Sequence, residues 1–212
     1  MTRIVLLRHG ESSANTGDEL GVPETPLTDT GHVQARDAAH KVVALGGPFH
    51  LISSPYKRAL DTAQHVASVI GHRGTIETDH RMREREFGAW SARKPSEMGK
   101  AEGYVIKVPG VKGKTMVNPD WHPEGGETLH DVRRRAVAAV NDAVAKHPGK
   151  TIVFATHGHV IRALSAHYSG SWASHRRPEN AEIRVFHHGV AEGLIETFLE
   201  TGECGNLSNF LF

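Results

Sequence analysis

Residues 3–11 read Arg-Ile-Val-Leu-Leu-Arg-His-Gly-Glu, and this stretch decides the fold. Its apolar run, Ile4 to Leu7, is rich in residues that favour β-structure and predicts a short, buried first strand. Arg8 and His9 follow the run at once. The first strand is therefore expected to deliver a cation and an imidazole to the edge of a sheet where its carboxyl end lies.

Further strands and helices alternate along the rest of the chain. The helix that begins at Ser54-Pro55 is expected to use Ser54 as its cap and Pro55 in its first turn. This alternation predicts an α/β fold around a mainly parallel sheet. Apolar runs predict strands at 49–53, 151–155, 183–186 and 194–198, and helical spacing predicts helices at 28–45, from 54 to about 70, 127–146 and 160–168.

The length of 212 residues allows one sizeable core, so a single domain over 1–212 is expected. The stretch 89–126 is rich in Gly, Pro and Lys and has no clear hydrophobic period. We interpret it as an insertion over one end of the sheet that acts as a lid.

Charge and cysteine content limit the class of partner and the compartment. The formal net charge is only +1, which argues against a general electrostatic grip on nucleic acid or on an anionic membrane. Cys204 is the single cysteine, so no intrachain disulfide can form. The apolar run 4–7 is too short for the core of a signal peptide. A cytoplasmic protein that binds neither nucleic acid nor membrane is therefore expected.

Cationic side chains follow three of the predicted strands. Arg8 and His9 follow the first, Arg58 comes shortly after the second, and His157 follows the strand at 151–155. Because ligands of open α/β sheets bind outside the carboxyl ends of the strands, these four side chains are expected to converge. Two guanidinium groups and two imidazoles suit an oxyanion, above all phosphate. A neutral imidazole there can attack phosphorus.

Two other ligand classes are weighed and set aside. The 16 histidines raise the question of a metal, and His157 and His159 form a His-x-His pair, but no acidic partner lies at helical ligand spacing. Gly113-Lys114-Thr115 is similar to the end of a nucleotide-binding P-loop, but Val108 stands where that loop needs glycine. No metal and no cofactor are expected.

Taken together, these motifs resemble those of the histidine phosphatase superfamily, also called the phosphoglycerate mutase-like family. The resemblance runs in family order from about residue 4 to residue 162. It rests on Leu7 to Glu11 with Asn15, on Pro26 to Ala35, on Ser53 to Ala63, on Arg83-Glu84 with Phe87 to Trp90, on Gly125 to Thr128 and on Thr156 to Gly158.

The resemblance implies a fold and a role for each matching residue. The fold is a three-layer α/β/α sandwich with a mostly parallel central sheet. His9 is the nucleophile and Glu84 gives a proton to the leaving oxygen, with Glu86 as its rival two residues on. The remaining matches form the phosphate pocket, in which Asn15 is an accessory contact: Arg8, Asn15, Arg58, His157 and Gly158.

The resemblance also implies an activity, with alternatives. We expect a phosphatase that hydrolyses a phosphomonoester of a small metabolite through a phosphohistidine on His9. One alternative is a cofactor-dependent phosphoglycerate mutase. The chain lacks the Arg-Arg-Ser element of such mutases, although Lys107, Lys112 and Lys114 offer anionic contacts. The other is a non-catalytic relative that binds phosphorylated ligands. A homo-oligomer also stays open, since Phe210-Leu211-Phe212 offers an apolar tail.

Overall fold

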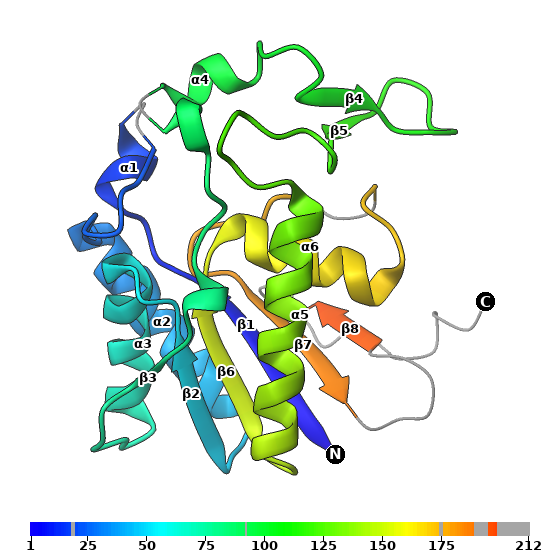
Figure 1. Cartoon of the computed structure of the whole chain (residues 1–212). Coiled ribbons are helices and arrows are strands. Elements are labelled where there is room, and N and C mark those ends of the chain that lie inside the picture. The colour runs from blue at the N-terminus through cyan, green and yellow to red at the C-terminus, as the bar shows by residue number, and fades with distance from the viewer. Residues whose placement is uncertain (18–19, 92, 174–175, 189–194, 199–212) are drawn as a thin grey trace.

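The computed structural model describes residues 1–17, 20–91, 93–173, 176–188 and 195–198. Cys204 and the apolar tail 210–212 lie outside the described residues, so the expectations attached to them stay predictions. Figure 1 shows the arrangement of the helices and strands.

The described residues form a six-stranded sheet in the order β3-β2-β6-β1-β7-β8. Strands β3, β2, β6 and β1 run parallel, whereas β7 is antiparallel to both β1 and β8. The prediction of a mostly parallel sheet is confirmed. The strands are β1 (Thr2–Arg8), β2 (Phe49–Ser53), β3 (Glu77–Thr78), β6 (Thr151–Thr156), β7 (Ile183–His188) and β8 (Ile195–Phe198).

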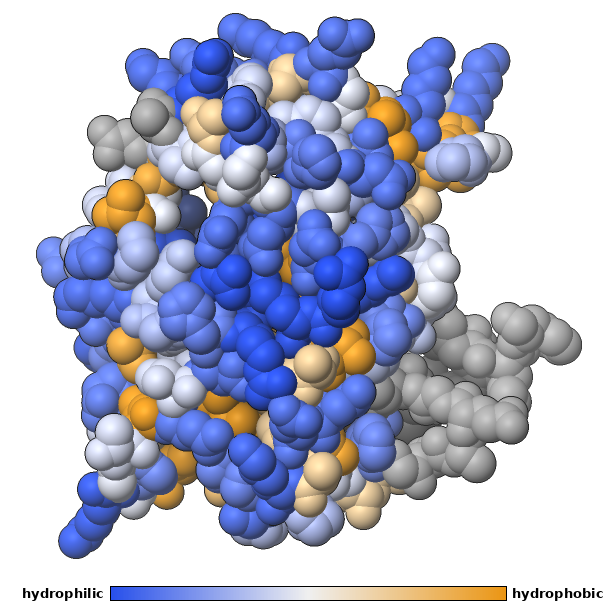
Figure 2. All heavy atoms as spheres, in the orientation of Figure 1, coloured by the Kyte–Doolittle hydropathy of each residue, from blue (hydrophilic) through white to orange (hydrophobic). Residues whose placement is uncertain are grey.

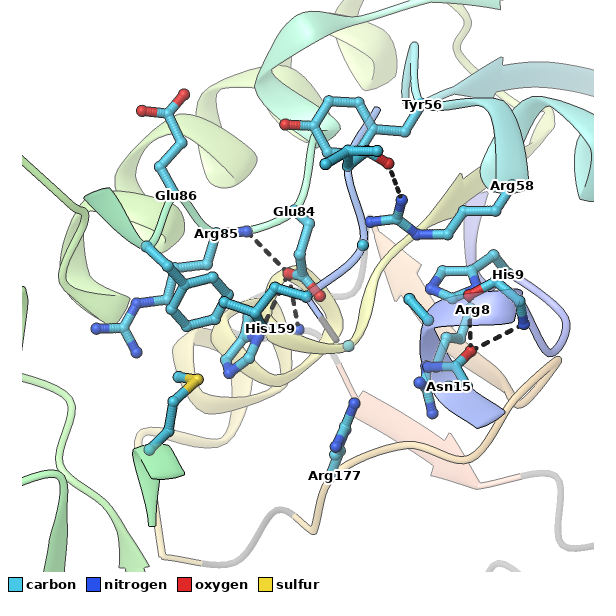
Figure 3. Close-up of a pocket in the computed structure, with 18 of the residues that line it drawn as sticks. Arg8, His9, Asn15, Tyr56, Arg58, Glu84, Arg85, Glu86, His159 and Arg177 are labelled. Atoms are coloured by element: carbon cyan, nitrogen blue, oxygen red, sulfur yellow. Dashed lines mark hydrogen bonds and ion pairs between the residues drawn. The ribbon is translucent and has the colours of Figure 1, made fainter. Parts of the chain in front are cut away.

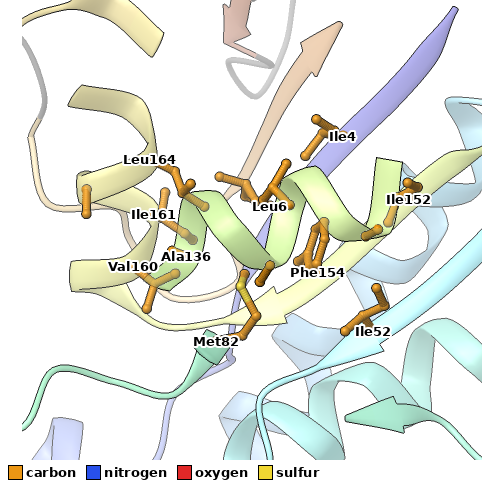
Figure 4. Packing of buried hydrophobic residues seen from close by; sticks show 14 of the residues in the cluster. Ile4, Leu6, Ile52, Met82, Ala136, Ile152, Phe154, Val160, Ile161 and Leu164 are labelled. Carbon is orange, nitrogen blue, oxygen red and sulfur yellow. The ribbon is translucent and has the colours of Figure 1, made fainter. Parts of the chain in front are cut away.

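Alternate residues of β1 face two separate hydrophobic clusters, because successive side chains of a strand point to opposite faces. Val5 and Leu7 belong to the cluster shared with α2 (Asp29–Ala44) and α3 (Lys57–Val69). Ile4 and Leu6 belong to the cluster shared with α5 (Leu129–Lys146) and α6 (Gly158–Ser169), which Figure 4 shows. Helices therefore cover both faces of the sheet, and the predicted three-layer α/β/α sandwich is confirmed.

Two helix caps follow from the sequence. The Thr28 hydroxyl accepts a hydrogen bond from the Gly31 N–H at 3.0 Å and so caps α2 as expected. Thr128 and Asp131 form a capping box at the start of α5, in which each side chain binds the other's backbone N–H at 3.0 Å. These bonds satisfy N–H groups that the first helical turn leaves without partners.

The prediction that Ser54 caps the following helix is wrong. Helix α3 begins at Lys57, and Tyr56 is its N-cap residue. Ser54 is fully buried, and its hydroxyl lies 2.8 Å from Nε2 of His157. The cap position has therefore moved two residues along the chain, and the serine side chain contacts the imidazole that follows β6.

The stretch 89–126 is more regular than its composition predicts. It contains α4 (Pro95–Met98) and a two-stranded antiparallel sheet of β4 (Val105–Lys107) and β5 (Thr115–Val117). Short strands with few apolar side chains give no clear sequence period, which is why the hairpin was missed. In Figure 1 this segment lies beyond the carboxyl ends of the central strands. The remaining short helices are α1 (Ser13–Thr16) and the 3₁₀ turns His80–Met82 and Gly88–Trp90.

Apolar residues are concentrated inside the described part of the molecule. Figure 2 shows a face on which hydrophilic residues predominate and apolar ones are scattered. Among the described residues, no helix is both long and apolar enough to span a bilayer. The large hydrophobic residues that do stand exposed are Met1, Val22, Val33, Val105 and Val111.

Candidate active site

Two glycines allow the loop after β1 to lie directly on the first turn of α2. A Cβ atom on Gly10 would lie 2.3 Å from the carbonyl oxygen of Gly31, and one on Gly31 would lie 1.9 Å from that of Glu11. Both obstacles are backbone atoms, so neither position has room for a side chain. The Thr62 hydroxyl of α3 also accepts a hydrogen bond from the Gly10 N–H at 3.1 Å. The loop that carries His9 is therefore fixed against α2 and α3.

His9 is held with one ring nitrogen ready to attack. Its Nδ1 lies 2.7 Å from the carbonyl oxygen of Gly10. Because a carbonyl oxygen only accepts, Nδ1 carries the hydrogen and Nε2 carries the lone pair. The backbone is anchored on both sides, since the His9 N–H donates to Thr156 at 2.9 Å and its carbonyl accepts from Ala181 at 3.1 Å. This arrangement presents an oriented, unprotonated nitrogen to the cavity.

The surroundings of His9 keep its imidazole neutral. Burial, followed by the positive charges of Arg58 and Arg8, lowers the pKa of His9 to about 3. Only 3% of the residue's surface is exposed. A neutral ring is the nucleophilic form of histidine, so these surroundings suit a nucleophilic role for His9.

Acidification is expected to destabilise the fold through His9. In the unfolded chain His9 takes up a proton near pH 6.5, whereas in the folded chain its pKa is about 3. Between these values the unfolded state binds more protons, so the free energy of unfolding falls as the pH falls from about 6.5 toward 3. Thermal melts at pH 7, 6 and 5 should show a steadily decreasing Tm.

The matched measurement is the same series on His9→Ala, which removes the group from both states. Its Tm should decrease less between pH 7 and pH 5 than that of the wild-type protein. Identical pH dependence of the two proteins would show that His9 titrates normally in the folded state.

Arg8 and Arg58 flank His9 and keep donors available for a ligand. Each uses Nη1 to hold the backbone: Arg8 donates to Pro178 at 2.7 Å and Arg58 to Val22 at 2.8 Å. Both side chains are buried and line the cavity, and Arg8 Nε has no hydrogen-bond partner. Figure 3 shows both guanidinium groups beside His9. Fixed donor forks beside a nucleophile fit the oxygens of a phosphoryl group.

Asn15 presents its amide nitrogen to the same cavity. Its Oδ1 accepts from the backbone N–H of Ser12 at 3.0 Å and from the Ser12 hydroxyl at 3.1 Å. This fixes the amide orientation, and Nδ2 donates to none of the described residues. Asn15 and Gly158 both line the cavity with Arg8 and His9. Asn15, the residue predicted to be an accessory phosphate contact, therefore lies at the predicted phosphate pocket.

His157 lies directly behind His9. The two ring centroids are 5.2 Å apart, and His157 is fully buried without being part of the cavity lining. Burial, followed by the charge of Arg58, lowers the pKa of His157 well below its ordinary value. Its Nδ1 has no hydrogen-bond partner. A buried polar atom without a partner among the described residues leaves His157 able to bond a group that arrives next to His9.

Glu84, rather than Glu86, faces the nucleophile's side of the cavity. Oε1 of Glu84 accepts from the backbone N–H groups of Arg85 at 2.9 Å and His159 at 3.3 Å, and lies 3.4 Å from Nδ1 of His159. Burial opposes ionisation of Glu84, but His159 and the donated N–H groups outweigh it and hold the pKa well below its ordinary value. In Figure 3 the Glu84 carboxylate points into the middle of the cavity, while Glu86 points away.

The Glu86 carboxylate already forms an ion pair with another residue. Glu86 is exposed at the cavity margin, and its carboxylate pairs with Arg83 at 2.8 Å. The geometry therefore favours Glu84 as the proton donor.

The cavity that these residues line is about 1100 Å³, far larger than one phosphate group. The insertion contributes Ser91, Met98, Tyr104, Val117 and Gly125 to it. Lys107, Lys112 and Lys114, the lysines expected to offer anionic contacts, do not line it. Trp121 does not line it either, and packs edge-on against Tyr104 at 4.9 Å.

Sequence reasoning missed four basic residues of the cavity, namely Arg85, His159, Arg162 and Arg177. Arg162 lies three residues after His159 on α6, so the two share a helix face, and this spacing was an available signal. Arg177 lies in an irregular segment after α6, where no periodicity points to the site. Tertiary structure alone brings it there.

One group of side chains has the composition of a metal site. Among the described residues, His50, Glu77 and His147 place one potential ligand atom each within 4.8 Å of one another. They lie on β2, on β3 and after the last residue of α5. His50 already contacts Glu77 at 2.8 Å, and its ring stacks on that of His147 at 3.5 Å. None of the three lines the cavity around His9.

Comparisons with known proteins show the family to which the chain belongs. The sequence profile of the histidine phosphatase superfamily (branch 1) matches residues 4–200. A glucosyl-3-phosphoglycerate phosphatase of Mycolicibacterium vanbaalenii is 33% identical over 172 residues, which cover 77% of this chain and 72% of that protein. The phosphoglycerate mutase-like protein 4 of Arabidopsis thaliana is 34% identical over 187 residues, covering 86% and 78% of the two chains.

A solved structure shows the same fold. The mycobacterial glucosyl-3-phosphoglycerate phosphatase in complex with VO3 has a TM-score of 0.75 and 26% identity, with 92% of this chain and 96% of that chain covered.

The fold, the site and these matches define the class: the chain belongs to the histidine phosphatase superfamily. More particularly, it is a phosphatase that hydrolyses phosphomonoesters of small metabolites.

Proposed function

We propose that the protein hydrolyses its substrate in two steps through a phosphohistidine on Nε2 of His9. The observation that carries this proposal is the contact of Nδ1 with the Gly10 carbonyl at 2.7 Å, because it leaves Nε2 as an unprotonated nucleophile beside two arginines. Nucleophile, cationic pocket and acid all line the same cavity.

In the first step Arg8, Arg58 and the Asn15 amide bind the phosphoryl oxygens. The charges of the two arginines offset the negative charge of the transition state. Nε2 of His9 then forms a bond to phosphorus while the bond from phosphorus to the substrate oxygen breaks. Glu84, which takes up a proton when the phosphate dianion binds beside it, donates that proton to this oxygen, which leaves as an alcohol.

In the second step water attacks the phosphorus and displaces His9. Glu84, now a carboxylate, takes the proton that the water loses. It releases this proton to solvent when inorganic phosphate leaves, and the enzyme returns to its starting state. His157 supports both steps from its place next to His9 through its unpartnered Nδ1.

We propose that the insertion 89–126 acts as a lid over this chemistry. The support is its contribution of Ser91, Met98, Tyr104, Val117 and Gly125 to the cavity lining. A reducing compartment such as the cytoplasm fits a chain with one cysteine.

Water, rather than a second substrate hydroxyl, is expected to be the final acceptor. The lysines of the insertion do not line the cavity, so they do not hold a bisphosphorylated intermediate there. The protein incubated with 3-phosphoglycerate and a trace of 2,3-bisphosphoglycerate should release free phosphate faster than it forms 2-phosphoglycerate. Both products are measured in the same sample. Rapid isomerisation with little phosphate release would identify a mutase instead.

A further inference from the structure

The cavity holds more positive charge than one phosphate group requires. Among the described residues, five arginines and three glutamates line it. Arg8 and Arg58 flank the nucleophile and serve the phosphoryl group. The other three arginines, Arg85, Arg162 and Arg177, serve no part of the proposed reaction.

Arg162 is buried without an acceptor. Only 8% of its surface is exposed, its Nε has no hydrogen-bond partner, and it forms neither a hydrogen bond nor an ion pair with any described residue. Burial lowers the pKa of Arg162, which shows that its charge is poorly solvated. An uncompensated buried charge is costly, so a site of this kind is expected to receive an anion from outside the chain.

An anchored segment holds Arg177 at the cavity. Arg8 donates to the Pro178 carbonyl at 2.7 Å, and the Ala181 N–H donates to the His9 carbonyl at 3.1 Å. Farther along the same segment, Glu182 forms an ion pair with Arg184 of β7 at 3.0 Å. The segment that carries Arg177 is thus fastened to the same loop that carries the nucleophile.

The guanidinium of Arg177 points into the cavity between His159 and Arg8 (Figure 3). A Cβ built on Gly158 would lie 3.8 Å from Nε of both Arg8 and Arg177, so the two arginines approach the start of α6 together. After burial, Arg177 is the main cause that lowers the pKa of Arg8 to about 10. The guanidinium of Arg177 forms no hydrogen bond or ion pair with a described residue, and only the backbone carbonyl of Arg177 is bound, by Arg176 at 3.2 Å.

Tyr104 adds a neutral donor to these arginines. It lines the cavity from the insertion, and burial raises its pKa above the ordinary value, so the phenol keeps its hydrogen at neutral pH. The charges of Arg85, Arg177 and Arg162 all act on it, which places it among them. Arg85 is already bound to the carbonyls of Glu127 and Trp121.

We propose that Arg162 and Arg177, with the Tyr104 hydroxyl, bind a carboxylate on the leaving-group alcohol, so that the substrate is a phosphorylated hydroxy acid. This inference rests on the proposed function, because it places the phosphate at His9. Two guanidinium forks and one hydroxyl match the two oxygens of a carboxylate. Glu179 lines the same cavity, and its negative charge offsets one of the two positive charges of Arg162 and Arg177. The remaining positive charge suits a monoanion better than a second phosphate dianion.

The test is a pair of substrates that differ only in the carboxylate. In 3-phosphoglycerate this group stands where glycerol 3-phosphate has a hydroxymethyl group. Charge-assisted hydrogen bonds predict that kcat/KM is higher for 3-phosphoglycerate by about tenfold to a hundredfold. Phosphoserine and phosphoethanolamine form a second such pair. The bisphosphate and monophosphate of propane-1,3-diol test a second phosphate as the bound anion.

Arg177→Gln should reduce the ratio of kcat/KM between the two members of each carboxylate pair by about tenfold. The ratio is the readout because any disturbance of the phosphate pocket lowers both members equally. Arg162→Met should reduce this ratio too. Because Arg177 is exposed whereas Arg162 is buried, Arg177→Gln is the variant that is expected to keep its fold. Arg134→Gln is the matched control and should leave the ratio unchanged. Arg134 lies on the exposed side of α5 and pairs with Asp131 at 3.1 Å.

The outcomes separate the two proposals. If the wild-type protein hydrolyses both members of each pair equally, the carboxylate subsite is overturned and the proposed function stands. A preference for the bisphosphate, without one for the carboxylate, also overturns it. An unchanged ratio in Arg177→Gln removes Arg177 from the subsite. If neither member is hydrolysed, the proposed function fails and this inference fails with it.

Discussion

Replacement of His9 by alanine is expected to lower kcat/KM by about a thousandfold or more. The proposed reaction passes through a bond between phosphorus and Nε2 of this residue. The other histidine among the described lining residues, His159, has its Nδ1 3.4 Å from the carboxylate of Glu84. Loss of a covalent nucleophile ordinarily leaves only the residual rate that binding and charge stabilisation supply. The measurement is hydrolysis of a phosphomonoester by wild-type and variant proteins of equal Tm.

The covalent intermediate gives a second, independent readout. Wild-type protein mixed with a ³²P-labelled substrate and denatured within one turnover should carry label that is lost in acid and kept in base, as expected for a phosphoramidate. His9→Ala should carry none. His40→Ala is the matched control, because His40 is an exposed histidine on α2, and it should be labelled like the wild type. Normal labelling of the His9 variant would move the nucleophile to another residue.

The position of His9, Arg58 and His157 could be predicted because topology alone determines it. Each follows a strand of a parallel set, and the carboxyl ends of parallel strands meet at one edge. Hydrogen-bonded pairing of β1 with β6 and of β6 with β2 places those ends side by side. The two-sided burial of Ile4 to Leu7 followed from their unbroken apolar character in the same way.

Other parts of the site depend on contacts that local sequence does not encode. Ser54 has the ordinary properties of a helix cap, but Tyr56 is the N-cap residue. The Ser54 hydroxyl accepts from the Tyr56 N–H at 3.3 Å and also contacts His157, more than a hundred residues away along the chain. Arg177 reaches the cavity because its neighbour Pro178 accepts a bond from Arg8. In both cases a long-range hydrogen bond decides where the side chain lies, and neither periodicity nor composition records such bonds.

The ionisation of Glu84 is expected to change when substrate binds. Burial raises the pKa of Glu84, but His159 and the N–H groups of Arg85 and His159 outweigh it, so the group is a carboxylate at neutral pH. A phosphate dianion beside it reverses the local charge, and repulsion between the two anions raises the pKa. Substrate binding is therefore expected to load Glu84 with the proton that it later donates.

Replacement of Glu84 by glutamine should therefore have a large effect that depends on the leaving group. A general acid contributes on the order of a hundredfold to ten-thousandfold when the leaving oxygen is a poor alkoxide, and far less when it is nitrophenolate, which needs no proton. We expect Glu84→Gln to lower kcat for an alkyl phosphate by a factor in that range, while it lowers kcat for nitrophenyl phosphate much less. Glu86→Gln is the matched variant, since it removes the neighbouring carboxylate that pairs with Arg83 at 2.8 Å. It should change both rates by the same small factor, because its charge does not reach the leaving oxygen. If the dependence on leaving group appears in Glu86→Gln instead, the proton donor lies two residues farther along the chain than the structure indicates.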